Sequence, residues 1–132
     1  MFKTPSDDEA LSDPFRDGVR LFNEEYFFEA HEHLEGIWRV ERGEPRQFLQ
    51  GLIQICAAFH HFQNGNLIGA VDLLKRGADK MRRYPGRYMG IDATALLAKV
   101  DDARDRIERM RTGKEDRGRV EFPKIELPGG GE

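Results

Sequence analysis

The segment from Phe22 to Trp38 holds the side chains of this sequence that are best suited to chemistry. It places two histidines and several glutamates among five large aromatic residues. Polar groups beside an apolar helix face need hydrogen-bond partners or water. His31 and Glu35 are four residues apart and share one helix face, which is how a single helix offers two ligands to a divalent metal. We therefore expect any functional site to include this segment.

Two interpretations of this cluster follow from the residue types. In the first, it meets the next helix in a polar pocket or hydrogen-bond network with a ligand-binding or structural role. The residues of that pocket are His31, Glu32, Glu35, Trp38, Gln50, Gln54 and His60. In the second, the cluster serves a metal-dependent enzyme whose cofactor is a divalent metal. The candidate ligands of that metal are His31, Glu35, His60 and His61. The sequence lacks the H-E-x-x-H motif of zinc proteases and the paired Glu-x-x-His motif of di-iron bundles, which favours the first interpretation.

A second group of candidate residues is basic. Residues 73–119 carry 14 Lys or Arg against 8 Asp or Glu, although the whole chain has a net charge of −3. Four of these cations gather near the end of one expected helix, where they also suit the helix dipole: Lys80, Arg82, Arg83 and Arg87. They form an anion-binding candidate, but the acidic chain and the few interleaved aromatic residues disfavour nucleic acid. A peptide-interaction surface at Ile37 and Trp38 is a further alternative.

Other classes of function are disfavoured by composition. Cys56 is the single cysteine, so it has no partner for an intramolecular disulfide, and its apolar neighbours indicate an inert buried thiol. The chain shows neither a signal peptide nor an apolar run of about 20 residues, which predicts a cytoplasmic protein without a membrane span. A homo-oligomer remains compatible with the sequence.

Five helices are expected to position these groups. Apolar periodicity predicts helices over about 13–24, 27–40, 45–63, 67–84 and 93–111, with Pro14 and Pro45 at two of the starts and Asp13, Asn66 and Asp92 as capping residues. The third is apolar around most of its circumference, so it should be central. We therefore predict an all-α fold with a single bundle over 13–112, a flexible arm over 1–12 and an extended or disordered tail over 113–132. Four apolar residues indicate that part of this tail lies across the bundle: Val120, Phe122, Ile125 and Leu127.

The sequence also repeats itself weakly. A shift of 40 residues aligns Phe22 with Phe62, Ala30 with Ala70, and Leu34 with Leu74. This pattern predicts two helical hairpins of similar design. Two copies are fewer than a repeat array normally needs to bury its faces, so a closed bundle is favoured.

The pattern F-N-x-x-x-F-F-E-A-H-E-x-L-E-x-x-W, here Phe22 through Trp38, resembles a prokaryotic family known as domain of unknown function 309. The run F-L-Q-G-L-I-Q at residues 48–54, the pair Gly65-Asn66 and the run from Ala70 to Leu74 are also similar to that family. The resemblance covers about residues 13–84. It implies a small helical bundle and no established activity. The sequence departs from the family pattern at Glu25, where glycine is common.

Overall fold

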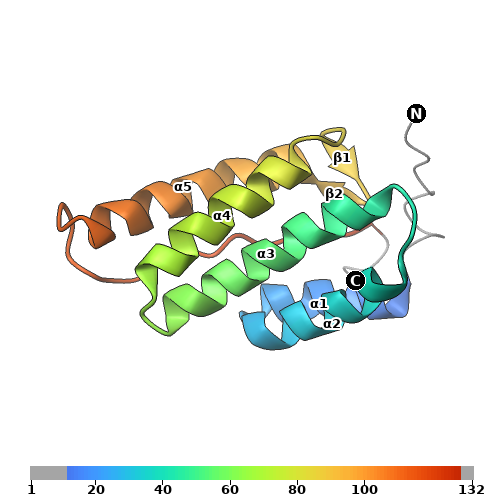
Figure 1. The fold of residues 1–132 in the computed structure, drawn as a ribbon, viewed down its shortest axis with the longest axis horizontal. Helices are drawn as coiled ribbons and strands as arrows, with labels where there is room; N and C mark the ends of the chain where they lie inside the picture. The colour runs from blue at the N-terminus through green and yellow to red at the C-terminus, as the bar shows by residue number, and fades with distance from the viewer. Residues whose placement is uncertain (1–11, 129–132) are drawn as a thin grey trace.

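The structure is a computed structural model that describes residues 12–128. Its elements are α1 (Asp13–Asn23), α2 (Phe27–Val40), α3 (Pro45–Gln63), α4 (Leu67–Met81), β1 (Arg87–Tyr88), β2 (Ile91–Asp92) and α5 (Ala93–Arg111). Helices α1 and α2 form one hairpin, α3 and α4 a second, and α5 packs along α4 (Figure 1). The predicted all-α bundle is confirmed. The predicted arm before Ser12 and the glycines after Pro128 lie outside the described residues.

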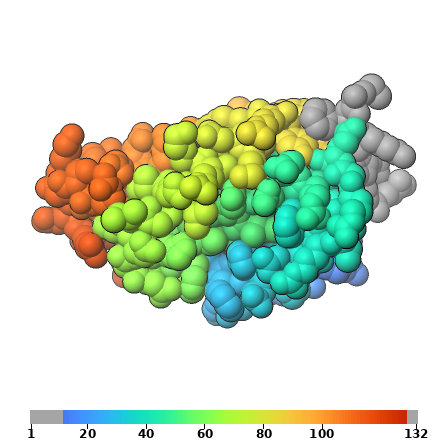
Figure 2. Space-filling model, viewed as in Figure 1, coloured from blue at the N-terminus to red at the C-terminus, as the bar shows by residue number. Residues whose placement is uncertain are grey.

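Helix α3 is central because it packs against α2 on one side and α4 on the other (Figure 1). Nine of its residues are buried: Phe48, Leu49, Gly51, Leu52, Ile53, Ile55, Cys56, Ala58 and Phe59. In the space-filling view, α2, α3 and α4 lie side by side on the face shown (Figure 2). This agrees with the expectation for a helix that is apolar around most of its circumference.

Helices α3 and α4 touch through their backbones. A Cβ atom added to Gly77 would lie 2.5 Å from the carbonyl oxygen of Gly51, and one added to Gly51 would lie 2.7 Å from the carbonyl oxygen of Gly77. Both positions therefore require glycine for the two helix axes to come this close.

The two hairpin turns have the same hydrogen bonds, 40 residues apart. In the first turn Glu25 N donates to Phe22 O (3.0 Å), and in the second Gly65 N donates to Phe62 O (3.0 Å). The next amide in each turn also reaches back five residues, from Tyr26 to Leu21 and from Asn66 to His61. This is the Schellman arrangement, which needs one residue with left-handed backbone geometry. The weak sequence repeat is therefore a repeat of turn geometry as well.

Glu25 occupies the left-handed position of the first turn at a φ of 68°, where the second turn has Gly65 at 83°. We expect Glu25→Gly to raise the free energy of unfolding by about 1 kcal/mol, because left-handed geometry strains any residue with a Cβ atom. The loss of the exposed Lys124–Glu25 ion pair (3.1 Å) offsets this gain only slightly. Urea denaturation monitored by circular dichroism measures the change. Gly65→Glu is the matched control and should change the stability in the opposite direction.

Four local predictions about helix ends can be compared with the structure. Asn66 and Asp92 cap α4 and α5 as expected, accepting bonds from Gly69 N (2.9 Å) and Ala95 N (3.0 Å). The cap of α1 was wrongly predicted at Asp13: Ser12 Oγ accepts from Phe15 N at 3.2 Å. Helix α4 ends at Met81 instead of near residue 84, because the residue before a proline avoids helical geometry, and residues 82–84 tighten into turns before Pro85.

The hairpin of β1 and β2 was not predicted. It pairs Arg87 with Asp92 and Tyr88 with Ile91 in antiparallel register, across a turn in which Met89 and Gly90 have φ values of 52° and 76°. Tyr88 and Ile91 are buried under it. Two-residue strands are too short for an alternating pattern to be recognised in a sequence. None of the helices between residues 12 and 128 combines the length and the apolar character that a membrane span requires.

Candidate functional site

Helix α2 brings His31, Glu32 and Glu35 together on its surface. Each of them offers one ligand atom, and these three atoms lie within 4.8 Å of one another. His31 Nε2 is 4.0 Å from Glu35 Oε2, and the two side chains are 25% and 29% exposed. Glu32 is exposed. The group is therefore a shallow, solvent-accessible cluster of one imidazole and two carboxylates.

The other side of the His31 ring faces the protein. Its Nδ1 atom is buried and has no hydrogen-bond partner among residues 12–128. The Phe28 ring stacks on it with centroids 6.3 Å apart, and Phe28 also contacts His60 at 5.3 Å. Because a buried N–H without an acceptor costs about 1–3 kcal/mol, the neutral ring is more stable with its proton on Nε2, facing Glu35. Phe28 thus links His31 of α2 to His60 of α3.

Gln54 of the predicted pocket faces α4 instead of α2. Gln54 Oε1 accepts a bond from Lys80 Nζ of α4 at 3.1 Å. Gln50 is half-buried, and no hydrogen bond joins Gln50 or Gln54 to α2 in the part of the chain that the structure describes. The structure therefore brings His31, Glu32 and Glu35 together and places His60 near them, while Gln54 belongs to the α3–α4 contact.

His60, His61 and Trp38 have local contacts, although the buried Nε1 atom of Trp38 has no hydrogen-bond partner within residues 12–128. His60 Nε2 lies 3.1 Å from Asn64 Nδ2, and His61 Nδ1 lies 3.2 Å from Asn66 Nδ2, so both rings support the α3–α4 turn. The guanidinium of Arg46 lies 4.0 Å from the centre of the Trp38 ring and donates to the Trp38 carbonyl oxygen at 2.6 Å. Trp38 and Arg46 thus hold the C-terminal end of α2 against the start of α3.

Of the four basic candidates, one is paired with a carboxylate within residues 12–128. Besides the bond from Lys80 to Gln54, Arg82 pairs with Asp101 of α5, and Arg87 donates to the carbonyl oxygen of Gly90 at 3.4 Å. Arg83 is exposed. The partly exposed Arg82–Asp101 pair contributes little to stability, and it neutralises one of the four candidate cations.

Cys56 is fully buried, and burial raises the pKa of its thiol above the usual range. We expect the native protein to react with a disulfide reagent at least a hundredfold more slowly than the urea-unfolded protein, because only the thiolate attacks and only unfolding exposes it. Absorbance of the released thiol measures both rates. Similar rates in the two states would contradict this assignment.

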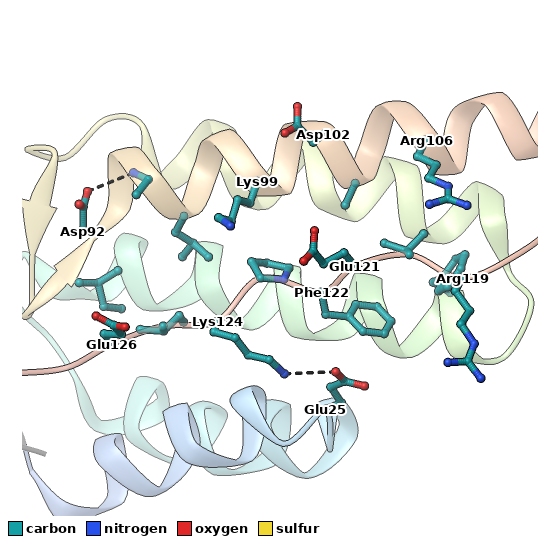
Figure 3. A pocket seen from close by; sticks show the side chains of 18 of the residues that line it. Glu25, Asp92, Lys99, Asp102, Arg106, Arg119, Glu121, Phe122, Lys124 and Glu126 are labelled. Atoms are coloured by element: carbon teal, nitrogen blue, oxygen red, sulfur yellow. Dashed lines mark hydrogen bonds and ion pairs between the residues drawn. The ribbon is translucent and has the colours of Figure 1, made fainter. Parts of the chain in front are cut away.

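A groove of about 1410 Å³ lies away from α2, between α5 and the extended residues 119–128, which we call the C-terminal segment. Figure 3 shows this segment running between α5 and α1, with Lys99, Asp102 and Arg106 of α5 along one wall. The charges that line the groove are mixed in sign. The apolar residues of this segment predicted that part of it lies across the bundle, but the groove was not predicted.

The C-terminal segment is attached to α1 by Asn23. Asn23 Nδ2 donates to the Ile125 carbonyl oxygen at 2.7 Å, and Ile125 N donates to Asn23 Oδ1 at 2.8 Å. Lys124 Nζ reaches the Asn23 carbonyl oxygen at 2.5 Å, and Arg16 Nη2 donates to the Pro128 carbonyl oxygen at 3.0 Å. The apolar residues of the segment indicated its position in advance. Nothing in the sequence indicated the role of Asn23.

Comparison with known proteins adds two findings. Residues 15–73 match the family described as "Domain of unknown function (DUF309)". An "Uncharacterized protein" of Aquifex aeolicus (strain VF5) is 29% identical over 77 residues, which cover 58% of this chain and 23% of that protein. The chain therefore spans less than a quarter of the length of this relative.

Proposed function

We propose, for a chain whose residues 15–73 match the DUF309 family, a binding function in which His31, Glu32 and Glu35 on α2 hold a divalent transition metal ion. The single observation that supports it is the mutual distance of their ligand atoms, all within 4.8 Å. Metal–ligand bonds of about 2.1 Å in tetrahedral geometry place the ligand atoms about 3.4 Å apart. The three ligand atoms must therefore approach one another by at most about 1.4 Å, which rotation of the exposed Glu32 side chain and of Glu35 can supply.

The chemistry of the donors indicates which ion is preferred. One imidazole nitrogen and two carboxylate oxygens suit Zn²⁺, Mn²⁺ or Fe²⁺. Three protein ligands on an exposed helix face leave at least one position for water or a small molecule. A pocket between α2 and the His60 end of α3 would then hold that molecule, with the Phe28 ring as an apolar wall between His31 and His60.

Two features limit the expected affinity. Glu35 Oε1 already pairs with Arg39 Nη2 at 3.0 Å, so a metal must compete with a guanidinium. Binding through His31 Nε2 also places the ring proton on the buried Nδ1, which has no acceptor among residues 12–128. We therefore propose a site that is weaker than a four-ligand structural zinc site.

Calorimetric titration of the untagged protein with Zn²⁺ and Mn²⁺ tests this function. We expect one ion per chain and at least a tenfold loss of affinity in His31→Ala and Glu35→Gln. His33→Ala and Glu29→Gln are matched controls on exposed positions of the same helix and should bind like the parent. Arg39→Ala should bind more tightly, since it frees Glu35. Absence of binding, or equal losses in the cluster and control variants, would rule the site out.

A further inference from the structure

We propose that the bundle carries a peptide-binding face for extended peptides of the pattern Phe-Pro-X-aliphatic, and that its own C-terminal segment occupies this face. The peptide-binding face is formed by the end of α1, the start of α2 and the last turns of α3. Residues 119–128 lie on it as an intramolecular ligand. A segment of the same pattern from another protein binds there when the C-terminal segment leaves.

An aromatic contact provides the side-chain specificity. The ring of Phe122 lies 4.9 Å from that of Phe27, 5.1 Å from that of Phe59 and 6.0 Å from that of Phe62, measured between centroids. All three are edge-to-face contacts, which is the favoured geometry for aromatic pairs, and the rings of Phe27 and Phe59 are fully buried. Val120 and Ile125 are buried on either side of Phe122. The face therefore selects one aromatic residue with an aliphatic residue three positions later.

Asn23 provides main-chain recognition. Its amide exchanges two hydrogen bonds with the N–H and C=O of Ile125, which are present in any residue except proline. Peptide-binding domains combine these two elements, since main-chain bonds contribute affinity and pockets for alternate side chains contribute specificity. Lys124, which reaches Glu25 and the Asn23 carbonyl oxygen, adds a preference for a basic residue between proline and the aliphatic residue.

The C-terminal segment is held like a ligand. Apart from the bonds of Asn23, Lys124 and Arg16, no hydrogen bond within residues 12–128 attaches residues 119–128 to the helices. It belongs to neither strand, and the groove of about 1410 Å³ remains open along its side towards α5 (Figure 3). The face and its occupant also come from different parts of the chain. Asn23, Phe27, Phe59 and Phe62 lie within the 15–73 match, and the occupant lies outside it.

A labelled peptide of residues 117–128 tests the proposal on the full-length chain. The parent should bind it weakly, because the linked segment competes at an effective concentration of about millimolar. The full-length Phe122→Ala variant should bind the peptide at least tenfold more tightly than the parent, by fluorescence anisotropy. The double variant Asn23→Ala/Phe122→Ala, or a peptide that itself carries the Phe122→Ala change, should lose that gain. A folded Phe122→Ala variant that binds the two peptides equally would overturn the proposal.

If the Phe122→Ala variant does not fold, a native protein cleaved before the C-terminal segment provides a second test. A specific protease site is placed in the connection at residues 114–117, and the purified native chain is cleaved there. We expect both fragments to elute together and the labelled peptide to replace the C-terminal fragment when in excess. The proposal fails if the released fragment and the peptide do not bind the remaining folded helices. It also fails if the fragment stays bound and excess peptide never exchanges with it.

Discussion

Replacing Gly77 by alanine is expected to lower the free energy of unfolding by about 3 kcal/mol, at the upper end of the range for overpacking a close-packed interior. The added Cβ atom would lie 2.5 Å from the Gly51 carbonyl oxygen and 3.2 Å from the Ile55 backbone nitrogen. Backbone atoms cannot move aside as the end of a flexible side chain does. The α3–α4 axes must therefore separate, and Lys80 of α4 would move away from Gln54.

Gly36→Ala in α2 is the matched control. It is the same substitution at an exposed position within a helix, and nothing lies within 4 Å of its new Cβ atom. Alanine has a better helix propensity than glycine, so this change should stabilise the protein by about 0.5–1 kcal/mol. Urea denaturation of both variants provides the comparison. Two changes of the same sign would show that α3 and α4 do not meet at these glycines.

Phe122→Ala is expected to lower the free energy of unfolding by about 2–3 kcal/mol. This is somewhat below the usual cost of truncating a fully buried phenylalanine, because Phe122 is half-buried. The substitution removes the ring contacts to Phe27, Phe59 and Phe62 and loosens the C-terminal segment. This loss of stability is large for a residue outside every helix and strand, because the Phe122 ring is part of one continuous aromatic core.

Phe28→Ala is the control for ring size. Phe28 is 48% exposed and contacts only His31 and His60 among the aromatic rings of residues 12–128. Its loss should cost about 0.5 kcal/mol, as for most surface substitutions. Guanidinium denaturation followed by tryptophan fluorescence measures both. If Phe122→Ala were no more costly than Phe28→Ala, the C-terminal segment would contribute nothing to the core.

The helices themselves could be predicted from the sequence almost to the residue. Helices α2, α3 and α5 begin and end where apolar periodicity, Pro45 and Asp92 place them. These signals are local, because a cap or a proline acts on amides within one turn. The central place of α3 was also predictable, since a helix with nearly no polar side needs neighbours on most sides.

The candidate site was predictable only in part. His31, Glu32 and Glu35 share one helix, so their proximity follows from helical spacing, and the structure brings them together. Whether the glutamines of α3 face α2 or α4 depends on how α3 is rotated between its two neighbours. The contact of Gly51 with Gly77 sets that rotation, and it places Gln54 beside Lys80. No local signal encodes this choice.

By itself, the sequence determined the five helices, their order, the repeated hairpin design and the histidine–glutamate cluster of α2. The tertiary structure alone decided the path of the C-terminal segment, the two hydrogen bonds between Asn23 and Ile125, and the partners of the basic residues. Helices are held by bonds between residues four apart, so a short window of sequence contains what specifies them. Asn23 and Ile125 are 102 residues apart, and their contact depends on the packing of every helix between them.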